Sequence, residues 1–368
     1  MAIDAPFWRG RRVFLTGHTG FKGSWLAFWL GRLGARVTGY ALAPPTAPSL
    51  FAVAGIAGDL ETHVVADVRD GARLAAAVAA ARPEVVFHLA AQPLVLPSYQ
   101  DPVGTYATNV MGTVHLLDAV RRTDGVRAVV NVTSDKCYEN RGWLWGYREN
   151  EPMGGRDPYS NSKGCAELVT AAFRQSFFGP GQGAGHAAGV ATARAGNVVG
   201  GGDWAAYRLV PDLVASFADG RPGVVRNRHA VRPWQHVLDP LGGYLMLAEA
   251  LWREPARFAD GWNFGPGEED VWPVHRLADR LAALWGEGAA WVDETGAGKP
   301  HEERTLALDC TKARLTLGWA PRWDTGATLA HTVAWYRAHQ AGGDLRRLMQ
   351  LQIDEHSAAD ATGRRSLP

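Results

Sequence analysis

The sequence predicts an α/β protein built on a doubly wound, parallel β-sheet that is joined to a smaller, mixed α/β lobe. In the first half of the chain, short runs of β-branched residues alternate with amphipathic helical patterns. This alternation is typical of parallel sheets with helices on both faces. The length of 368 residues allows about two domains, which is enough for a large core and a cleft between two lobes.

The order of apolar runs along the chain predicts the individual elements. Apolar residues that recur at three- and four-residue spacing indicate helices over 24–35, 72–82 and 110–122, and a further helix follows Pro158. Compact runs rich in valine indicate strands over 13–15, 36–40, 62–68, 84–91, 128–134 and 189–199. Beyond these strands the chain becomes rich in Gly, Pro and Trp, which predicts the start of the second lobe.

These patterns predict a division of the chain into two lobes and a tail. The sheet lobe is expected to hold residues 1–193, with 231–260 returning to it, and the second lobe 194–230 and 261–350. Residues 354–368 are polar and lack periodicity, so we expect a flexible tail there. Most of the 15 tryptophans are expected in the core, because many recur at helical spacing with other apolar residues, as at Trp25 and Trp29.

The composition argues against several classes of protein. The 38 Lys and Arg residues are balanced by 37 Asp and Glu, which leaves no broad basic field for nucleic acid. We also expect no signal peptide and no membrane span, since no apolar stretch approaches roughly 20 residues. The cysteines form no CxxC pair and no even set, which indicates a reducing compartment such as the cytoplasm. The pair His301-Glu302 lacks the second histidine of a zinc-binding helix, so no metal site is expected.

A glycine-rich loop follows the first predicted strand and leads directly into a helix. Its glycines recur at every third position, at Gly17, Gly20 and Gly23. Such glycines permit a tight turn, a close approach of the backbone to a pyrophosphate, and close packing of helix on strand. The loop therefore predicts a Rossmann-type dinucleotide site, in which we include Phe21 and Lys22.

The cofactor predicted for this site is NAD. An acidic residue that would bind the 2′-hydroxyl of its ribose is missing after the second strand, and no arginine for a 2′-phosphate replaces it. Lys22 is expected either to reach such a phosphate or to be solvated. Asp67 and Val68, at the end of the third strand, are expected beside the adenine.

Tyr159 and Lys163 lie four residues apart in the helix that begins at Pro158, so both side chains project from one face. An ammonium group near a phenol favours the phenolate, which predicts a lowered pKa for Tyr159. Such a tyrosine can take a proton from a hydroxyl while hydride leaves the same carbon for nicotinamide.

Together the segments TGHTGFKG and YSNSK resemble the extended short-chain dehydrogenase/reductase superfamily, whose nucleotide-sugar enzymes pair an NAD-binding lobe with a sugar-nucleotide lobe. The resemblance implies that the strand end at 88–92 lines the cofactor through Leu89, Ala90 and Ala91. It also implies that Gln92 lies near the substrate and that Ser134 hydrogen-bonds the reacting hydroxyl. Members commonly pair through helices of the sheet lobe, which implies a homodimer.

Asp135 and Lys136 stand directly after Ser134 and distinguish the subfamilies. Oxidation at C4 of a hexose makes the C5 proton acidic, so a base that removes it and an acid that protonates the departing C6 hydroxyl can eliminate water. The Asp-Lys pair resembles the CDP-glucose 4,6-dehydratase family. That resemblance implies Asp135 as the acid and Lys136 as the base, and a role in deoxysugar synthesis of the lipopolysaccharide type.

Further segments resemble the same family, including RAGNVVGGGDW (194–204) and RPWQHVLDP (232–240). The resemblance implies a CDP-glucose substrate held by six side chains: Gln92, Arg194, Asn197, Arg208, Arg232 and Gln235. Guanidinium groups match phosphate oxygens in geometry. Two alternatives remain open, an epimerase, reductase or dehydratase that acts on another nucleotide sugar, and a non-catalytic protein that binds NAD(H).

Overall fold

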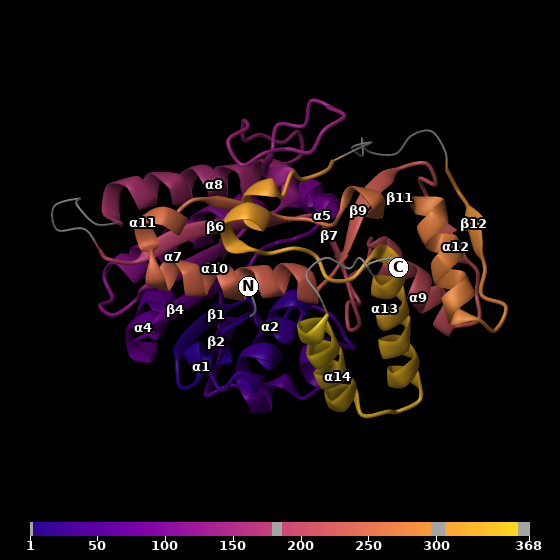
Figure 1. The fold of residues 1–368 in the computed structure, drawn as a ribbon, viewed down its shortest axis with the longest axis horizontal. Helices are drawn as coiled ribbons and strands as arrows, with labels where there is room; N and C mark the ends of the chain where they lie inside the picture. The colour runs from indigo at the N-terminus through magenta and orange to yellow at the C-terminus, as the bar shows by residue number, and fades with distance from the viewer. Residues whose placement is uncertain (1–2, 179–185, 296–305, 360–368) are drawn as a thin grey trace, which may run out of the picture.

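The computed structural model describes residues 3–178, 186–295 and 306–359. Its centre is a seven-stranded sheet in which every neighbouring pair of strands is parallel (Figure 1). The strands in spatial order are β10 (Gly261–Phe264), β6 (Gly189–Ala195), β5 (Ala128–Val132), β4 (Val85–His88), β1 (Arg12–Thr16), β2 (Arg36–Ala41) and β3 (Thr62–Val65). The predicted parallel sheet is confirmed.

Both faces of this sheet are buried under helices, as a doubly wound fold requires. Val13 and Leu15 of β1 pack into one core with α2 (Phe21–Arg32) and α10 (Leu238–Arg253), and α10 crosses in front of the sheet in Figure 1. Phe14, between them, packs into a second core on the opposite face. That face is covered by α4 (Gly71–Ala81), α7 (Gly112–Arg121) and α8 (Pro158–Phe177).

Tryptophans fill much of the first core. Trp25 and Trp29 of α2 are buried, and so are Trp262 of β10 and Trp335. Burial of one such ring removes on the order of 200 Å² from water, so these side chains contribute strongly to the stability of the fold. The prediction that these tryptophans belong to the core is confirmed.

The strand predicted over 189–199 is divided in two. β6 ends at Ala195, and β7 (Asn197–Val199) belongs to another sheet, in the order β11 (Val271–Pro273), β9 (Val231–His236), β7. Gly196 lies at the break, where an added Cβ would come within 3.0 Å of the carboxylate of Asp135. The chain therefore leaves the main sheet beside the residues predicted to be catalytic.

The second lobe lies on the right of Figure 1. It contains the β11-β9-β7 sheet, the pair β8 (Gly223–Val225) and β12 (Trp291–Asp293), and the helices α9 (Leu209–Ala218), α12 (Val274–Trp285) and α13 (Thr325–Gln340).

The predicted boundaries between the two lobes need two corrections. β10 pairs with β6, so residues 261–264 belong to the main sheet. β9 is the centre of the smaller sheet, so the return to the first lobe begins with α10.

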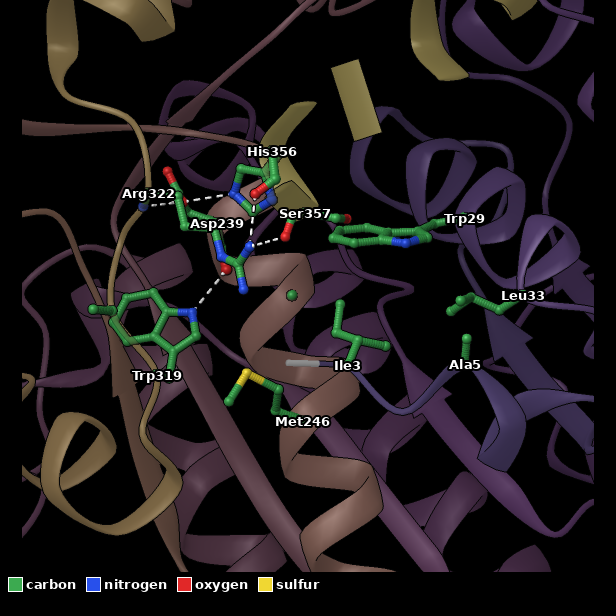
Figure 2. A pocket seen from close by; sticks show the side chains of 12 residues that line it. Ile3, Ala5, Trp29, Leu33, Asp239, Met246, Trp319, Arg322, His356 and Ser357 are labelled. Atoms are coloured by element: carbon green, nitrogen blue, oxygen red, sulfur yellow. Dashed lines mark hydrogen bonds and ion pairs between the residues drawn. The ribbon is translucent and has the colours of Figure 1, made fainter. Parts of the chain in front are cut away.

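The end of the chain departs from the predicted tail. α14 (Leu345–Ala358) extends through residues 354–358, and His356 Nε2 donates to the Asp239 carboxylate over 2.8 Å. Arg322 donates to the carbonyl oxygens of His356 and Ser357 at the helix end (Figure 2). A small cavity beside these contacts is lined by Trp29, Met246 and other side chains. The contacts of α14 with Asp239 and Arg322 explain why residues 354–358 are helical and do not form a flexible tail. Residues 360–368 lie outside the described part of the chain.

Shorter segments connect these elements within the described residues. They are α1 (Ala5–Trp8), α3 (Leu50–Val53), η1 (Ile56–Asp59), α5 (Val95–Gln100), α6 (Pro102–Tyr106), η2 (Ala107–Met111), η3 (Asp135–Cys137), α11 (Pro255–Phe258), η4 (Glu268–Asp270) and η5 (Ala313–Leu317). No helix among the described residues is long and apolar enough to cross a membrane.

Candidate active site

The glycine loop connects the end of β1 to the start of α2. Gly17 has a φ of +77°, and a Cβ there would lie 2.7 Å from the amide nitrogen of Ala90. A Cβ at Gly23 would lie 2.1 Å from the carbonyl oxygen of Gly17. At Gly20 the nearest atom would be 3.5 Å away. Close packing therefore requires Gly17 and Gly23, whereas Gly20 leaves open space above the loop.

The N-terminus of α2 is suited to an anion. Gly20 provides no capping side chain, and the first turn contains no acidic residue. The first N–H groups of a helix have no carbonyl partner within it, and they carry a partial positive charge. An uncapped helix start below an open glycine is the arrangement that binds a dinucleotide diphosphate.

Thr16 joins the end of β1 to the end of β4. Its hydroxyl accepts hydrogen bonds from the amides of Leu89 and Ala90, each over 3.1 Å, and lies 2.7 Å from Nδ1 of His88. Because the Thr16 oxygen already accepts hydrogen bonds from two N–H groups, we assign its O–H as the donor to His88 Nδ1. Burial and the nearby Lys163 lower the pKa of His88 to about 3, so this imidazole is neutral. Leu89 and Ala90 are thus fixed beside the glycine loop.

Tyr159 and Lys163 lie one turn apart in the first part of α8. Asp157 caps the helix by accepting from the Ser160 amide over 2.9 Å, and Pro158 occupies the first turn. Both functional side chains are buried. The Ser134 hydroxyl lies close enough to the Tyr159 phenol to lower its pKa, so three residues of the predicted catalytic set lie together.

The pKa values of this pair differ from the expectation. Burial raises the pKa of Tyr159 to about 12, although the nearby Ser134 hydroxyl opposes the rise. Burial lowers the pKa of Lys163 to about 8. The predicted lowering of the tyrosine pKa was wrong for this structure, because the cost of placing a phenolate in the interior outweighs the effect of nearby cations.

Asp135 and Lys136 form the short helical turn η3 after β5. Asp135 is buried, and its Oδ1 accepts from Ser134 Oγ over 3.0 Å and lies 3.7 Å from Lys136 Nζ. Its Oδ2 is buried without a hydrogen-bond partner in the described structure. The side chain of Lys136 is 28% exposed. The turn therefore places a buried carboxyl beside a more accessible amine, next to Ser134 and Tyr159.

Lys22 lies elsewhere than predicted. Its side chain turns into the protein, and its ammonium donates to the Tyr244 hydroxyl over 3.0 Å. Burial and the charges of Lys163 and Arg208 lower the pKa of Lys22 to about 7. Neither a solvated position nor one beside a 2′-phosphate fits this placement. The glycine-loop motif gave no signal that Lys22 would join the catalytic cluster.

The third strand ends beside a surface ion pair. Asp67 lies 2.6 Å from the Arg69 guanidinium, and its carbonyl oxygen accepts from the Tyr40 hydroxyl over 2.9 Å. The hydrogen bond from Arg69 lowers the pKa of Asp67, although burial opposes this, so the carboxylate is ionised at neutral pH. Val68 is buried against Gly112. These contacts hold the strand end where the adenine of a dinucleotide is predicted.

Arg208 lies near the catalytic cluster, and two other predicted substrate residues, Asn197 and Arg232, lie on β7 and β9 of the smaller sheet. Arg208 is 2.8 Å from Asp203, and its charge acts on both Tyr159 and Lys22. Asn197 has a buried amide nitrogen without a partner in the described structure, and Arg232 is buried in β9.

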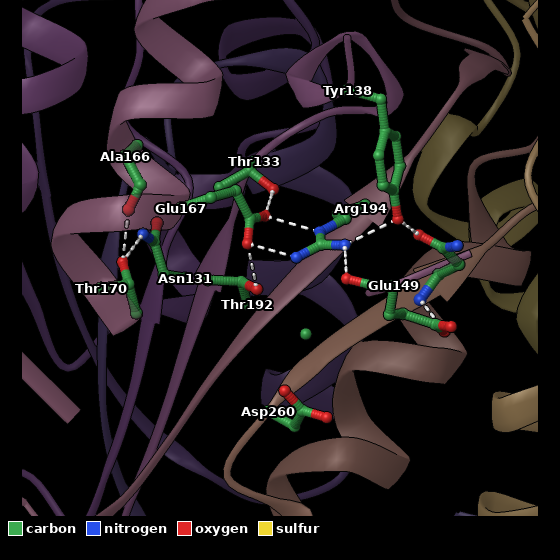
Figure 3. A network of polar contacts seen from close by, with 12 residues as sticks. Asn131, Thr133, Tyr138, Glu149, Ala166, Glu167, Thr170, Thr192, Arg194 and Asp260 are labelled. Atoms are coloured by element: carbon green, nitrogen blue, oxygen red, sulfur yellow. Dashed lines mark hydrogen bonds and ion pairs between the residues drawn. The ribbon is translucent and has the colours of Figure 1, made fainter. Parts of the chain in front are cut away.

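Three other predicted substrate residues donate hydrogen bonds to groups of the protein itself. The Arg194 guanidinium donates to both oxygens of Glu167, to the Tyr138 hydroxyl and to a backbone carbonyl (Figure 3). Gln235 is buried and donates through Nε2 to the Phe264 carbonyl, while its Oε1 has no hydrogen-bond partner in the described structure. Gln92 donates to the Leu94 carbonyl and to the Thr105 hydroxyl of α6. Arg194 is therefore corrected from a substrate ligand to a buried structural ion pair.

The parallel sheet, the glycine loop and the Ser134, Tyr159 and Lys163 group define an extended short-chain dehydrogenase/reductase. A family model described as GDP-mannose 4,6 dehydratase matches residues 14–332. The chain belongs to this family.

Curated relatives fall within the same group of enzymes. The chain is 53% identical to a CDP-glucose 4,6-dehydratase of Salmonella typhimurium, over 97% of this chain and 99% of that protein. It is 31% identical to a dTDP-glucose 4,6-dehydratase of Streptomyces antibioticus, over 89% of this chain and 93% of that protein. The alignments span both lobes, so the similarity is not restricted to the glycine loop.

A solved structure gives the same result for the fold. A dTDP-glucose 4,6-dehydratase of Streptomyces venezuelae, solved with NAD and TYD bound, superposes with a TM-score of 0.75. It is 25% identical and covers 91% of this chain and 99% of its own. A UDP-glucose 4-epimerase of Thermotoga maritima shares the fold, with a TM-score of 0.76 at 22% identity. One fold thus serves both dehydration and epimerisation, and the difference must lie in the site.

Proposed function

We propose that the protein dehydrates CDP-D-glucose to CDP-4-dehydro-6-deoxy-D-glucose. The observation that carries this function is the turn Ser134-Asp135-Lys136, which places a carboxyl and an amine beside Tyr159. The high identity to a CDP-glucose 4,6-dehydratase over nearly the whole chain supports the same reaction and the same nucleotide.

The cofactor is NAD, and the glycine loop fits it. Open space at Gly20 and the uncapped start of α2 suit the diphosphate, while Leu89, Ala90 and Ala91 lie at the neighbouring strand end and Asp67 at the adenine end. When bound, NAD accepts hydride from the sugar and returns it within one turnover, so the reaction has no net redox change.

Tyr159 is proposed to take the proton from the 4-hydroxyl. The Ser134 hydroxyl lowers the pKa of this phenol and is proposed to hydrogen-bond the reacting oxygen. Lys163 lies one turn further along α8, where a positive charge stabilises a phenolate at the moment the proton is transferred. Oxidation at C4 then makes the proton on C5 acidic.

Asp135 and Lys136 are proposed to carry out the elimination. Lys136, the more accessible of the two, takes the proton from C5 in its neutral form. Asp135, when protonated, gives its proton to the departing C6 hydroxyl through the oxygen that has no partner in the described structure. An acid and a base on adjacent residues can act at adjacent carbons, which an epimerase does not need.

We propose that the sugar nucleotide lies between the main sheet and the second lobe. Arg208, Asn197 and Arg232 are the predicted ligands that support this placement, since all three follow the point where the chain leaves the main sheet. Guanidinium groups suit the diphosphate. Arg194 has no part in this proposal, whereas Gln235, whose Oε1 has no hydrogen-bond partner in the described structure, remains a predicted ligand.

We also propose a homodimer. Val103, Met111 and Leu168 are exposed apolar side chains on α6, η2 and α8, which pack against one another and form one outer face of the sheet lobe. The described cysteines are free thiols, which supports a cytoplasmic location. The product class supports a role in deoxysugar synthesis for lipopolysaccharide.

Incubation of the protein with NAD and, in separate reactions, with CDP-, dTDP-, GDP- and UDP-glucose tests this function. Alkali-induced absorbance reports 4-keto-6-deoxy sugars, and mass spectrometry identifies the products. We expect loss of one water from the CDP sugar. Loss of water from another donor alone would refute the assigned nucleotide, whereas inversion at C4 without loss of water would indicate an epimerase.

A further inference from the structure

A buried ion pair lies directly behind the catalytic residues. Glu167 and Arg194 are both buried, on α8 and β6, with 2.7 Å between Oε2 and Nη2. Arg194 donates through Nε to Oε1 and through Nη2 to Oε2, so the contact is bidentate (Figure 3). Burial works to raise the pKa of Glu167, but the Arg194 charge and its hydrogen bonds outweigh burial and hold this pKa below its usual value. The carboxylate is therefore ionised at neutral pH.

The two partners of this pair hold both ends of the catalytic turn. Thr133 precedes Ser134, and its hydroxyl donates to Glu167. Tyr138 follows Cys137, and its hydroxyl accepts from Arg194 Nη1 over 2.6 Å. The segment 134–137, which carries the acid, the base and the serine, is thus tied at each end to a single ion pair.

The same carboxylate acts on the helix that carries the other catalytic residues. Glu167 lies four residues after Lys163, so both project from the same side of α8. Its negative charge raises the pKa of Lys163 and opposes the lowering by burial. Glu167 therefore links the turn after β5 to the Tyr159–Lys163 turn of α8.

We propose that Glu167 and Arg194 are positioning residues for the dehydratase reaction, which hold the segment 134–137 in register with Tyr159 and Lys163. This inference rests on the proposed function. Since neither residue is proposed to touch the substrate, their loss is expected to lower kcat and to leave KM nearly unchanged.

Two conservative substitutions test the proposal against a matched control. Thr133→Val removes the hydrogen bond at one end of the segment, and Thr192→Val removes a 2.7 Å hydrogen bond to the same carboxylate from β6. Each variant loses one threonine hydroxyl from Glu167, so we expect similar losses of thermal stability. We expect a roughly 10-fold lower kcat for Thr133→Val and less than about a twofold change for Thr192→Val.

Tyr138→Phe provides the same test at the other end. It removes the hydroxyl that Arg194 contacts and keeps the ring, so a similar loss of kcat is expected. It also replaces Thr133→Val as the test if that variant does not fold. Equal losses of kcat in the Thr133 and Thr192 variants would overturn the proposal. So would a wild-type kcat in a folded Thr133→Val variant or in a folded Tyr138→Phe variant.

Glu167→Gln tests the electrostatic part. Removal of this charge is expected to lower the pKa of Lys163, so the alkaline limb of the kcat profile should move to lower pH by roughly one unit. Thr133→Val leaves all charges in place and should not move that limb. An unmoved limb in Glu167→Gln would contradict the link to Lys163.

Amide hydrogen exchange separates this proposal from the proposed function. In the free protein, Thr133→Val should increase exchange within 134–138, and Thr192→Val should not. This readout needs no substrate, so it holds even if the wild-type protein proves to act on another nucleotide sugar. Unchanged exchange in Thr133→Val would contradict the proposed positioning of the segment 134–137 and would leave the proposed function untouched.

Discussion

At the scale of single residues, the site combines groups whose environments differ although they are adjacent in sequence. Asp135 is buried, and one of its oxygens has no partner among the described residues, whereas Lys136 retains access to solvent. Elimination needs this kind of separation between an acid and a base. The different roles proposed for the two residues follow from their burial, because the backbone of η3 turns Asp135 inward and Lys136 outward.

Asp135→Asn tests the role of the acid. Asparagine keeps the shape and the hydrogen bond to Ser134 but cannot donate a carboxylic proton. We expect dehydration to fall by about 100-fold or more, while oxidation at C4, which depends on Tyr159, continues. Reduced cofactor should therefore accumulate in single-turnover mixing, where its absorbance reports it. Full dehydratase turnover in this variant would remove Asp135 from the mechanism.

Tyr159→Phe tests the first step. The phenyl ring preserves packing in this buried position and removes the group that takes the proton. We expect at least a roughly 1000-fold loss of kcat and an unchanged dissociation constant for the sugar nucleotide. Isothermal titration supplies the binding control. Appreciable formation of reduced cofactor would show that another base starts the reaction.

At the scale of elements, the start of α2 shows how a motif can specify local structure. Gly23→Ala would place a Cβ 2.1 Å from the Gly17 carbonyl, so we expect a destabilisation of at least about 2 kcal/mol. Gly20→Ala meets nothing closer than 3.5 Å, so its stability should be close to wild type. Its affinity for NAD should nevertheless fall, because the methyl group occupies space above the loop. Equal melting temperatures for the two variants would contradict this assignment.

The attachment of the N-terminal segment to α10 predicts a dependence of stability on pH. Glu249 accepts from Trp8 Nε1 over 2.8 Å and from the Asp4 amide, and burial raises its pKa to about 7. The pKa of Glu249 is higher in the folded protein than in the unfolded chain. The contribution of this carboxyl to the free energy of unfolding is therefore complete below pH 4.5 and is lost as the pH rises through 7.

Glu249→Gln keeps an acceptor and removes the titration. The variant should melt at a higher temperature than wild type at pH 8, and the difference should shrink toward pH 5. Thermal unfolding in matched buffers measures this. A difference that grows as the pH falls would have the wrong sign for a buried carboxyl with a raised pKa.

At the scale of the whole molecule, the sequence predicted the sheet more accurately than it predicted side-chain contacts. Periodicity and glycine spacing depend on local geometry, so the parallel sheet and the glycine loop could be predicted. Arg194 pairs with Glu167 and Lys22 with Tyr244 across long sequence separations, and no local pattern signals such contacts. α14 was missed for the same reason, because its order depends on docking against Asp239.

The assignment of both half-reactions to one site leads to a direct test with CDP-glucose that carries deuterium at C4. Under the proposed mechanism, hydride leaves C4 and returns to C6 within the same active site. We therefore predict a product that has lost one water and retains the deuterium at C6, as mass spectrometry and NMR would show. Loss of the label to solvent, or a labelled product that has lost no water, would contradict intramolecular dehydration.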